Sequence, residues 1–225
     1  MDAGCAVELV HSASLVLDDL PCMDDASLRR GRAATHREFG QATAILASIG
    51  LLNRAFGALA EHDATDPQLR ARAARVLSDA IGSNGMIAGQ EIDLHERASV
   101  DTESGIEGVN WLKTGTLFVA AAHMGALAAQ LPPQGTEAVK ECAKHVGLAF
   151  QTADDLIDQT ADIASAGKDV GQDAGLPTLV SLAGPQGALH SCKEHLEIAR
   201  SALDRSGLET VNLLSLVDSI FGSRT

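Results

Sequence analysis

The stretch LVLDDLPCMDD, Leu15 to Asp25, places four aspartates in eight positions directly after an apolar run. Apolar residues recur before it at the three-and-four spacing of a buried helical stripe, so we expect a helix over residues 3–19 that ends in the aspartates. Pro21 then bends or stops this helix. Carboxylates this close repel one another, so a compensating cation is expected beside them.

The composition favours an all-α fold. The 225 residues, 45% of them hydrophobic, are enough for one large core, so we expect a single domain over residues 1–225. Aromatic residues make up only 3% and Tyr is absent, so residues that favour strands are scarce. No strand alternation is convincing, and the helical pattern predicts further helices over 42–60, 68–95, 111–130, 136–163, 179–183, 189–206 and 208–221. Residues 99–108 and 164–177 are expected to be loops.

Charge and cysteine content exclude several classes of function. The net charge of -13 repels nucleic-acid phosphates and anionic lipids, so no nucleic-acid partner is expected. The four cysteines are scattered singly, which predicts reduced, buried thiols. We find neither a signal-peptide pattern nor an apolar run of some 18 residues. The expectation is therefore a cytoplasmic protein without stable membrane insertion.

A second aspartate cluster lies in FQTADDLIDQTAD, Phe150 to Asp162, inside the predicted helix 136–163. Asp154 and Asp158 are four residues apart and Asp155 is three from Asp158, so these carboxylates share one helical face. One such motif alone is explained equally well by a solvated acidic face. Two clusters that both interrupt apolar helices instead favour Mg²⁺, a cation that takes oxygen ligands and shares its coordination with substrate phosphates.

The order of the motifs resembles that of the polyprenyl synthetase family, the trans-isoprenyl diphosphate synthases, from Ala6 to about Ser181. The segments are DDLPCMDD (18–25), LRRGRAATHREFG (28–40), GQEIDL (89–94), KTG (113–115), FQTADDLID (150–158) and GKDVGQDAG (167–175). The resemblance implies an isoprenoid synthase-type helical bundle around a deep central cavity. It also implies two facing aspartate motifs and about three Mg²⁺ ions that bridge them to an allylic diphosphate.

The residue types suit that chemistry. Loss of diphosphate from an allylic substrate leaves a carbocation, so the site must stabilise the departing charge and exclude water. By resemblance, the metal ligands are Asp18, Asp19, Asp24, Asp154, Asp155 and Asp158. The same resemblance makes Arg29, Lys113, Thr114, Gln151 and Lys168 contacts of the allylic diphosphate, with Lys113 and Lys168 as catalytic cations, and gives isopentenyl diphosphate the cations Arg30 and His11.

Taken singly, several of these residues have simpler explanations. An Arg29–Arg30 doublet is common in solvated loops, Lys113 can extend from its helix into water, and His11 can be an ordinary helical histidine. Gln90 and Asp93 are explained as readily by a structural role as by direct participation. Their order in the motif series favours function for the first group.

Two departures from the family pattern concern isopentenyl diphosphate. The family's usual chain begins several helices earlier and contains a Gly-Gly-Lys-x-x-Arg-Pro segment, whereas Met1 stands 17 residues before Asp18. We therefore expect the N-terminal helices to be lacking. Leu176 in GLPT stands where the family has a further lysine. Without two or three charge-assisted hydrogen bonds, each worth about 1.5–3 kcal/mol, this substrate would bind more weakly by several orders of magnitude.

Three functions remain open under one fold. The first is a prenyl diphosphate synthase that joins isopentenyl diphosphate to an allylic diphosphate. The second ionises the allylic substrate alone, as a class I terpene cyclase or a prenyltransferase with another acceptor. The third is a non-catalytic subunit of a complete synthase, which would gain nothing from two clusters of repelling carboxylates. For a synthase, the small residues Ala13 and Ser14 favour a C20 product over C15, and family members are commonly homodimers.

Overall fold

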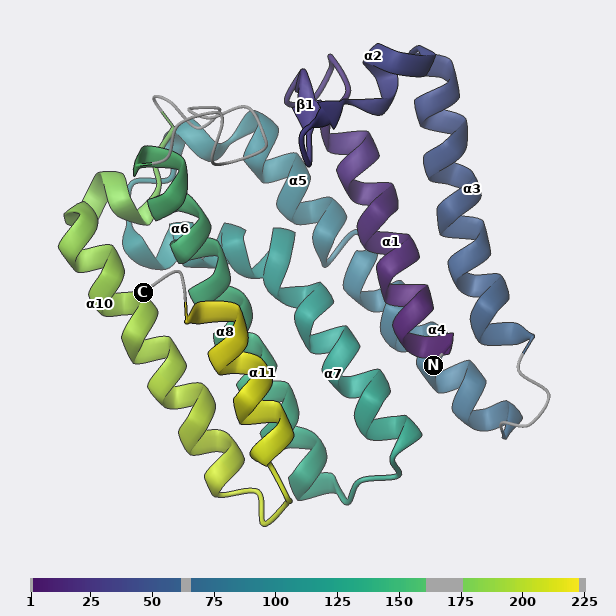
Figure 1. The fold of residues 1–225 in the computed structure, drawn as a ribbon, viewed down its shortest axis with the longest axis vertical. Helices are drawn as coiled ribbons and strands as arrows, with labels where there is room; N and C mark the ends of the chain where they lie inside the picture. The colour runs from purple at the N-terminus through teal and green to yellow at the C-terminus, as the bar shows by residue number, and fades with distance from the viewer. Residues whose placement is uncertain (1, 62–65, 161–175, 223–225) are drawn as a thin grey trace. The chain divides into compact units, whose positions relative to one another are not determined.

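The computed structural model describes residues 2–61, 66–160 and 176–222, and most of them are helical (Figure 1). The expected all-α fold is confirmed. The chain divides into two compact units, one of Met1–Ala74 with Asp158–Ala174 and one of Arg75–Ile157 with Gly175–Thr225. The prediction of a single domain stays a prediction.

The first unit is built on α1 (Asp2–Asp18) and α3 (Gln41–Ala60), which lie side by side (Figure 1). Small residues are buried on both helices, with Ala6 and Ala13 on α1 and Ala44 and Ala55 on α3. Alanines at helical spacing let two helices approach closely and bury their apolar stripes. The helices expected over residues 3–19 and 42–60 are therefore confirmed to within two residues.

A short hairpin and a helix of one turn join these two helices. Strands β1 (Leu28–Arg29) and β2 (Arg32–Ala33) pair antiparallel, and α2 (Thr35–Phe39) follows. The turn residues Arg30 and Gly31 have φ of 52° and 74°, the left-handed pair that a two-residue hairpin favours. The expectation of no strand is wrong here, because strands of two residues are too short to show alternation.

Helix α3 also contradicts an expectation about membranes. It is long and apolar enough to cross a membrane by length and composition, although no such run was expected. This is weak evidence for a span, since the core helix of a soluble protein passes the same test. Its charged side chain, Arg54, lies near the helix end and donates to both carboxylate oxygens of Glu61, at 2.7 and 2.8 Å.

The second unit is a bundle of long helices. Its elements are α5 (Met86–His95), η1 (Arg97–Ser99), α6 (Glu103–Asn110), the π-helical η2 (Trp111–Gly115), α7 (Thr116–Ala128), α8 (Pro133–Thr160), α10 (Leu179–Asp204) and α11 (Val211–Phe221), while α4 (Pro67–Ile81) leads into it. Its main core lies where α8, α10 and α11 pack together, around Val146, Leu196 and Phe221 (Figure 1).

Two element boundaries differ from expectation, and one predicted break agrees with it. The helix predicted over residues 68–95 is two helices, because the chain leaves α4 at Gly82 and begins α5 after Gly85. The loop predicted over 99–108 holds α6, whose N-cap Thr102 accepts from the Gly105 amide. The predicted break between helices 179–183 and 189–206 is confirmed: α10 is interrupted at Gly184, φ 72°, and Pro185 restarts the helix four residues earlier than predicted.

The cysteines are free, but only two are buried as expected. Cys142 and Cys192 lie in the core of the second unit, whereas Cys5 and Cys22 are exposed, so the prediction is wrong for this pair. Cys5 sits on the solvent side of α1 and Cys22 in the turn after it. Burial raises the pKa of Cys142 to about 11, which keeps it a neutral thiol.

Candidate functional site

In the first unit, a tight turn folds the first aspartate motif back onto the end of α1. The Asp24 amide donates to the Asp18 carbonyl at 2.9 Å, and the Asp25 amide donates to the Leu20 carbonyl at 3.0 Å. Asp25 adopts φ 47°, which reverses the chain. The turn therefore brings Asp18 and Asp24, six residues apart, to the same end of the helix.

Asp19, 1% exposed, is anchored by Arg29. The Arg29 Nε and Nη2 both donate to Asp19 Oδ1, at 2.9 and 2.5 Å. Burial alone lowers the pKa of Arg29, but the hydrogen bond and charge of Asp19, followed by the charges of Asp18 and Asp24, outweigh it and raise this pKa. Arg29 thus lies within the field of all three aspartates, and one Asp19 oxygen is committed to the guanidinium.

His11 belongs to the same region. Burial lowers its pKa most, Glu8 raises it, and the positive charges of Arg30 and Arg29 lower it further. The net shift is downward, so His11 is neutral at pH 7. His11 thus lies within the electrostatic field of Arg30, the other residue expected to contact isopentenyl diphosphate.

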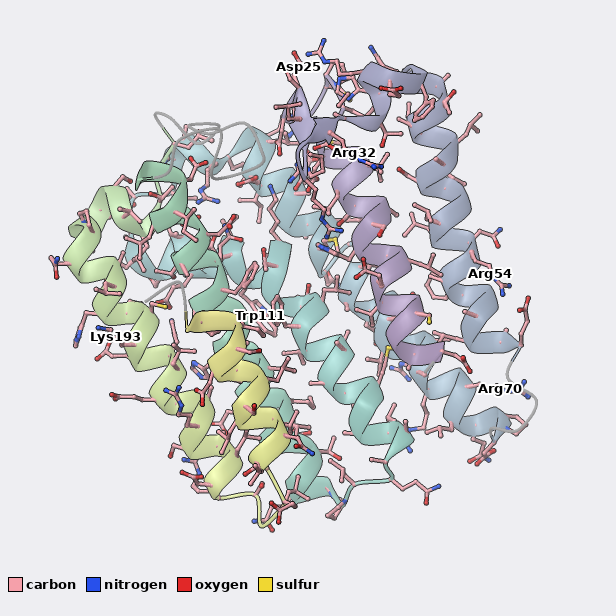
Figure 2. All side chains as sticks on the ribbon, viewed as in Figure 1. Asp25, Arg32, Arg54, Arg70, Trp111 and Lys193 are labelled. Atoms are coloured by element: carbon pink, nitrogen blue, oxygen red, sulfur yellow. The ribbon has the colours of Figure 1, made fainter. Side chains whose placement is uncertain are left out.

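Asp25, the remaining aspartate of this turn, has a different role. It accepts from Arg37 Nη2 at 2.9 Å, and both residues are exposed. Figure 2 labels Asp25. Asp25 was not among the expected metal ligands, and its bond to Arg37 of α2 gives it a structural use.

In the second unit, the KTG motif lies in the π-helical segment η2, which begins at Trp111 (Figure 2). Single turns of π-helix are frequent at functional sites because they shift the direction of the side chains. Gly89 of the GQEIDL motif packs directly on this segment. A Cβ at this position would lie 2.3 Å from the backbone nitrogen of Lys113. Gly115 in turn packs against the Trp111 ring.

A chain of hydrogen bonds links the KTG and FQTADD motifs. Thr114 Oγ1 donates to Gln151 Oε1 at 2.9 Å, and Gln151 Nε2 donates to Asp155 Oδ1 at 2.9 Å. Asp155 is 3% exposed, while Asp154 and Asp158 on the same helix are half-buried. Thr114 therefore fixes the amide of Gln151, and Gln151 fixes the Asp155 carboxylate.

Lys113 is bound by Asp93, an acidic residue for which the sequence left a structural role and direct participation equally open. The Lys113 Nζ donates to Asp93 Oδ2 at 2.5 Å, and Asp93 Oδ1 accepts from Arg97 Nη1 at 2.8 Å. Arg97, which was not expected at the site, is 6% exposed. In the sequence, the four-residue spacing of Asp93 and Arg97 on a helical pattern could have indicated Arg97. Such acid–base pairs are, however, common on solvated surfaces.

These motifs relate the chain to known proteins. The family model described as polyprenyl synthetase matches residues 1–202. The chain belongs to the polyprenyl synthetase family.

Curated relatives in this family are prenyl diphosphate synthases. The chain is 43% identical to a geranylgeranyl diphosphate synthase from Pantoea ananas over 90% of its own length and 66% of that protein. It is 36% identical to a farnesyl diphosphate synthase from Bacillus subtilis, covering 96% of the chain and 75% of the relative. The chain therefore spans about two thirds to three quarters of the length of these relatives.

Solved structures of the family share the fold. A geranyltransferase from Helicobacter pylori, complexed with magnesium and isoprenyl diphosphate, matches with a TM-score of 0.88 at 26% identity, over 99% of this chain and 73% of that one. A farnesyl/geranylfarnesyl diphosphate synthase from Zymomonas mobilis matches with a TM-score of 0.85 at 34% identity, over 97% and 75%.

The donor set fits the Mg²⁺ expected of a polyprenyl synthetase. Among residues 2–61, 66–160 and 176–222, no three His, Cys, Asp or Glu side chains gather tightly enough to hold a metal by themselves. Carboxylates one turn apart on a helix, as with Asp154 and Asp158, suit a cation that keeps several waters and is completed by substrate phosphates. Lys168 lies outside the described residues, and Leu176 is half-buried just before α10.

Proposed function

We propose that this chain is a Mg²⁺-dependent prenyl diphosphate synthase that joins isopentenyl diphosphate to an allylic diphosphate and releases a short-chain, C20 or C15, prenyl diphosphate. The observation that carries the proposal is the hydrogen-bond chain from Thr114 through Gln151 to Asp155, beside Lys113. It holds the Asp155 carboxylate in fixed relation to η2, the turn that also carries Lys113, within one unit. A diphosphate that contacts both a lysine and a metal held by carboxylates requires this pairing of a lysine with a carboxylate.

Each group has a specific task in this reaction. The allylic C–O bond breaks with its electron pair leaving on diphosphate, the double bond of isopentenyl diphosphate forms the new C–C bond, and a proton is lost. Lys113 stabilises the negative charge of the leaving diphosphate. Magnesium ions, when bound to the aspartates, supply further positive charge to that diphosphate. The released diphosphate takes the proton, because no described side chain stands out as a base.

His11 and Arg30 are proposed as contacts of isopentenyl diphosphate. Arg30 carries the positive charge, and His11, kept neutral by burial and its arginine neighbours, donates or accepts a hydrogen bond. This pair favours condensation over ionisation alone, since a cyclase has no second diphosphate to bind.

Product length is proposed to depend on the face of α1 that carries Ala13 and Ser14. Ala13 is fully buried, and Ser14 Oγ donates to the His11 carbonyl of its own helix at 2.9 Å. Both side chains are small, and a bulky aromatic at either position would fill space that a growing prenyl chain could use. C20 is therefore the favoured product and C15 the next.

We also propose that the chain works as a homodimer in the cytoplasm. Helix α3 exposes Ile45, Leu46 and Ile49, and Phe39 precedes it, so an apolar face is open to solvent. A second copy also carries a charge of -13 and would be repelled by an acidic face. Helix α3 contains no Asp or Glu, so it offers copies of this chain an uncharged surface to share. Four free thiols are consistent with a reducing compartment.

The test is product analysis with purified protein. The protein is incubated with Mg²⁺ and farnesyl diphosphate, with and without isopentenyl diphosphate, and all products are separated by chromatography. A longer diphosphate formed only with isopentenyl diphosphate supports the synthase, and hydrocarbons or alcohols formed without it support ionisation alone. Inertness toward C5, C10 and C15 allylic diphosphates supports a subunit role. Lys113→Ala is expected to abolish turnover, whereas the exposed Lys193→Ala, its matched control (Figure 2), is not.

A further inference from the structure

Three charged side chains of the second unit form a continuous cluster. Asp93 lies at the centre, with Lys113 Nζ on its Oδ2 at 2.5 Å and Arg97 Nη1 on its Oδ1 at 2.8 Å. The side chains are 14%, 26% and 6% exposed for Asp93, Lys113 and Arg97. Each oxygen of the carboxylate thus accepts from a different cation, in a partly desolvated place where such bonds are strong.

Arg97 is held more firmly than the other two. Its Nε donates to the Pro177 carbonyl at 2.8 Å, 80 residues away in the sequence. Pro177 precedes Thr178, the N-cap of α10, whose hydroxyl accepts from the Ser181 amide in a capping box. Two nitrogens of the planar Arg97 guanidinium therefore donate to groups that the fold holds in place, the Asp93 carboxylate and the Pro177 carbonyl.

The charges of this cluster have a consequence for anion binding. An isolated Asp93–Lys113 pair would be neutral and would offer a diphosphate no net attraction. With Arg97 included, two positive charges face one negative charge, and the cluster carries a net charge of +1. Arg97 offsets the negative charge of Asp93, so Asp93 can fix the position of Lys113 without adding a net negative charge beside it.

We propose that Asp93 and Arg97 are positioning residues for Lys113: Asp93 sets where the ammonium lies, and Arg97 preserves its charge for the diphosphate of the allylic substrate. The inference rests on the proposed function of Lys113. Neither residue touches substrate in this proposal, and both act through the lysine.

The two roles predict opposite effects on diphosphate affinity. Arg97→Gln leaves the cluster with no net charge, so affinity for Mg²⁺-diphosphate is expected to fall about tenfold. Asp93→Asn raises the net charge to +2, so affinity is expected to stay equal or tighten a few-fold. The same variant is expected to lower kcat about tenfold or more, because Lys113 is no longer held in place. A residue that merely stabilised the fold would move affinity and kcat downward in both variants.

The experiment is isothermal titration of the full chain with inorganic diphosphate in Mg²⁺ buffer, paired with kcat and KM for farnesyl diphosphate. The double variant Asp93→Asn/Arg97→Gln restores the charge of +1 and is expected to bind within about threefold of the parent chain while kcat stays low. Arg97→Lys keeps the charge and should also bind within about threefold, which covers a failure of Arg97→Gln to fold. The control is Arg200→Gln, which removes the exposed Arg200–Asp218 pair and should change neither quantity.

The possible results separate this inference from the proposed function. Weaker diphosphate binding in Asp93→Asn and Arg97→Gln alike, in proportion to a fall in thermal stability, would overturn the positioning roles and leave the synthase proposal standing. A parent chain that binds diphosphate but never condenses two substrates removes the synthase proposal, while the signs of the two affinity changes still decide the inference. A parent chain that does not bind Mg²⁺-diphosphate at all overturns both.

Discussion

Gly89 of α5 lies close against the backbone of Lys113. A Cβ on the glycine would lie 2.3 Å from the backbone nitrogen of Lys113 and 2.7 Å from the Cα of Lys113. Neither partner can yield cheaply, because both are backbone in helical segments. The glycine thereby fixes how close α5 comes to the π-helical turn that carries Lys113 and Thr114.

Gly89→Ala is therefore expected to destabilise the chain by about 1–3 kcal/mol, the usual cost of overpacking. It should also weaken Mg²⁺-diphosphate binding, because η2 must move. Urea unfolding and calorimetric titration measure the two effects. The matched control is Gly108→Ala on α6, where an added methyl meets nothing within 4 Å and helix propensity improves. Equal stability of the two variants would contradict the close approach.

Thr114→Val removes the hydroxyl that orients Gln151 and, through it, Asp155. We expect Mg²⁺-diphosphate affinity to fall about 5–10-fold, the worth of one hydrogen bond next to a charged group, and Thr114→Ser to restore it. Thr116→Val is the control, since Thr116 Oγ1 donates to the Leu112 carbonyl one turn back at 2.8 Å. A Thr114→Val chain with unchanged affinity would show that the amide of Gln151 needs no orientation.

Arg29→Ala is expected to be far more costly than Arg37→Ala, although both arginines bind an aspartate of the same unit. Without Arg29, the Asp19 carboxylate is left 1% exposed without its guanidinium partner, at a cost of about 3–5 kcal/mol. Arg37 and Asp25 are both exposed, so their pair is worth about 1 kcal/mol or less. Thermal unfolding of the two variants makes the comparison, and similar losses would contradict the buried pair.

Acid is expected to destabilise the second unit through His145. Its Nδ1 lies 2.9 Å from His195 Nδ1, and His195 Nε2 lies 3.4 Å from Glu107 Oε1. Burial lowers the pKa of His145 most, with His195 and Lys144 adding to the effect, while Glu141 and Glu107 oppose it. The folded chain thus binds a proton less readily than the unfolded chain.

The free energy of unfolding should consequently be constant above the ordinary histidine pKa of 6.5 and fall as the pH drops below it. His11, whose pKa is also lowered, contributes with the same sign. Urea unfolding between pH 8 and pH 5 measures the slope. His145→Gln should flatten it, whereas His190→Gln, at an exposed position on α10, should leave it unchanged. A slope unaffected by His145→Gln would exclude this residue as its source.

Leu46→Glu tests the proposed dimer. The side chain is 68% exposed on the apolar face of α3. In a dimer that shares this face, the introduced carboxylate would face the same carboxylate of the second copy and be repelled by it. Light scattering should show a dimer for the parent chain and a monomer for the variant. Leu216→Glu on α11, also exposed, is the control and should remain dimeric. A monomeric parent chain would contradict the proposal.

The sequence predicted the long helices and the break after residue 183 well, and the other interruptions poorly. Helices α1 and α3 carry apolar stripes over several turns, so their ends were placed within two residues. The break between α4 and α5 was missed because the periodicity continues across it, and only the backbone at Gly82 and Gly85 leaves the helix. Hairpin β1–β2 was missed because its turn chemistry, not its alternation, defines it.

For the site, motif order identified the groups but not their connections. Thr114 and Gln151 were both expected near the allylic diphosphate, yet their hydrogen bond follows from the rotation of η2 against α8, which no local pattern encodes. Arg97 was missed because a buried arginine is indistinguishable in sequence from a solvated one. Its partner Pro177 is 80 residues away, and such a contact depends on the tertiary fold alone.

The kink of α10 at Gly184 and Pro185 separates two segments that are continuous in the chain but independent in helical phase. Within an unbroken α-helix, inserting or deleting one residue rotates everything beyond it by about 100°, and buried side chains then face solvent. At a kink the rotation of the downstream segment does not depend on that of the upstream segment. A change of length there therefore leaves the buried face of each segment toward the core. Position 184 is thus where this helix can gain or lose a residue during evolution while Leu179 and Leu196 both keep their places in the core.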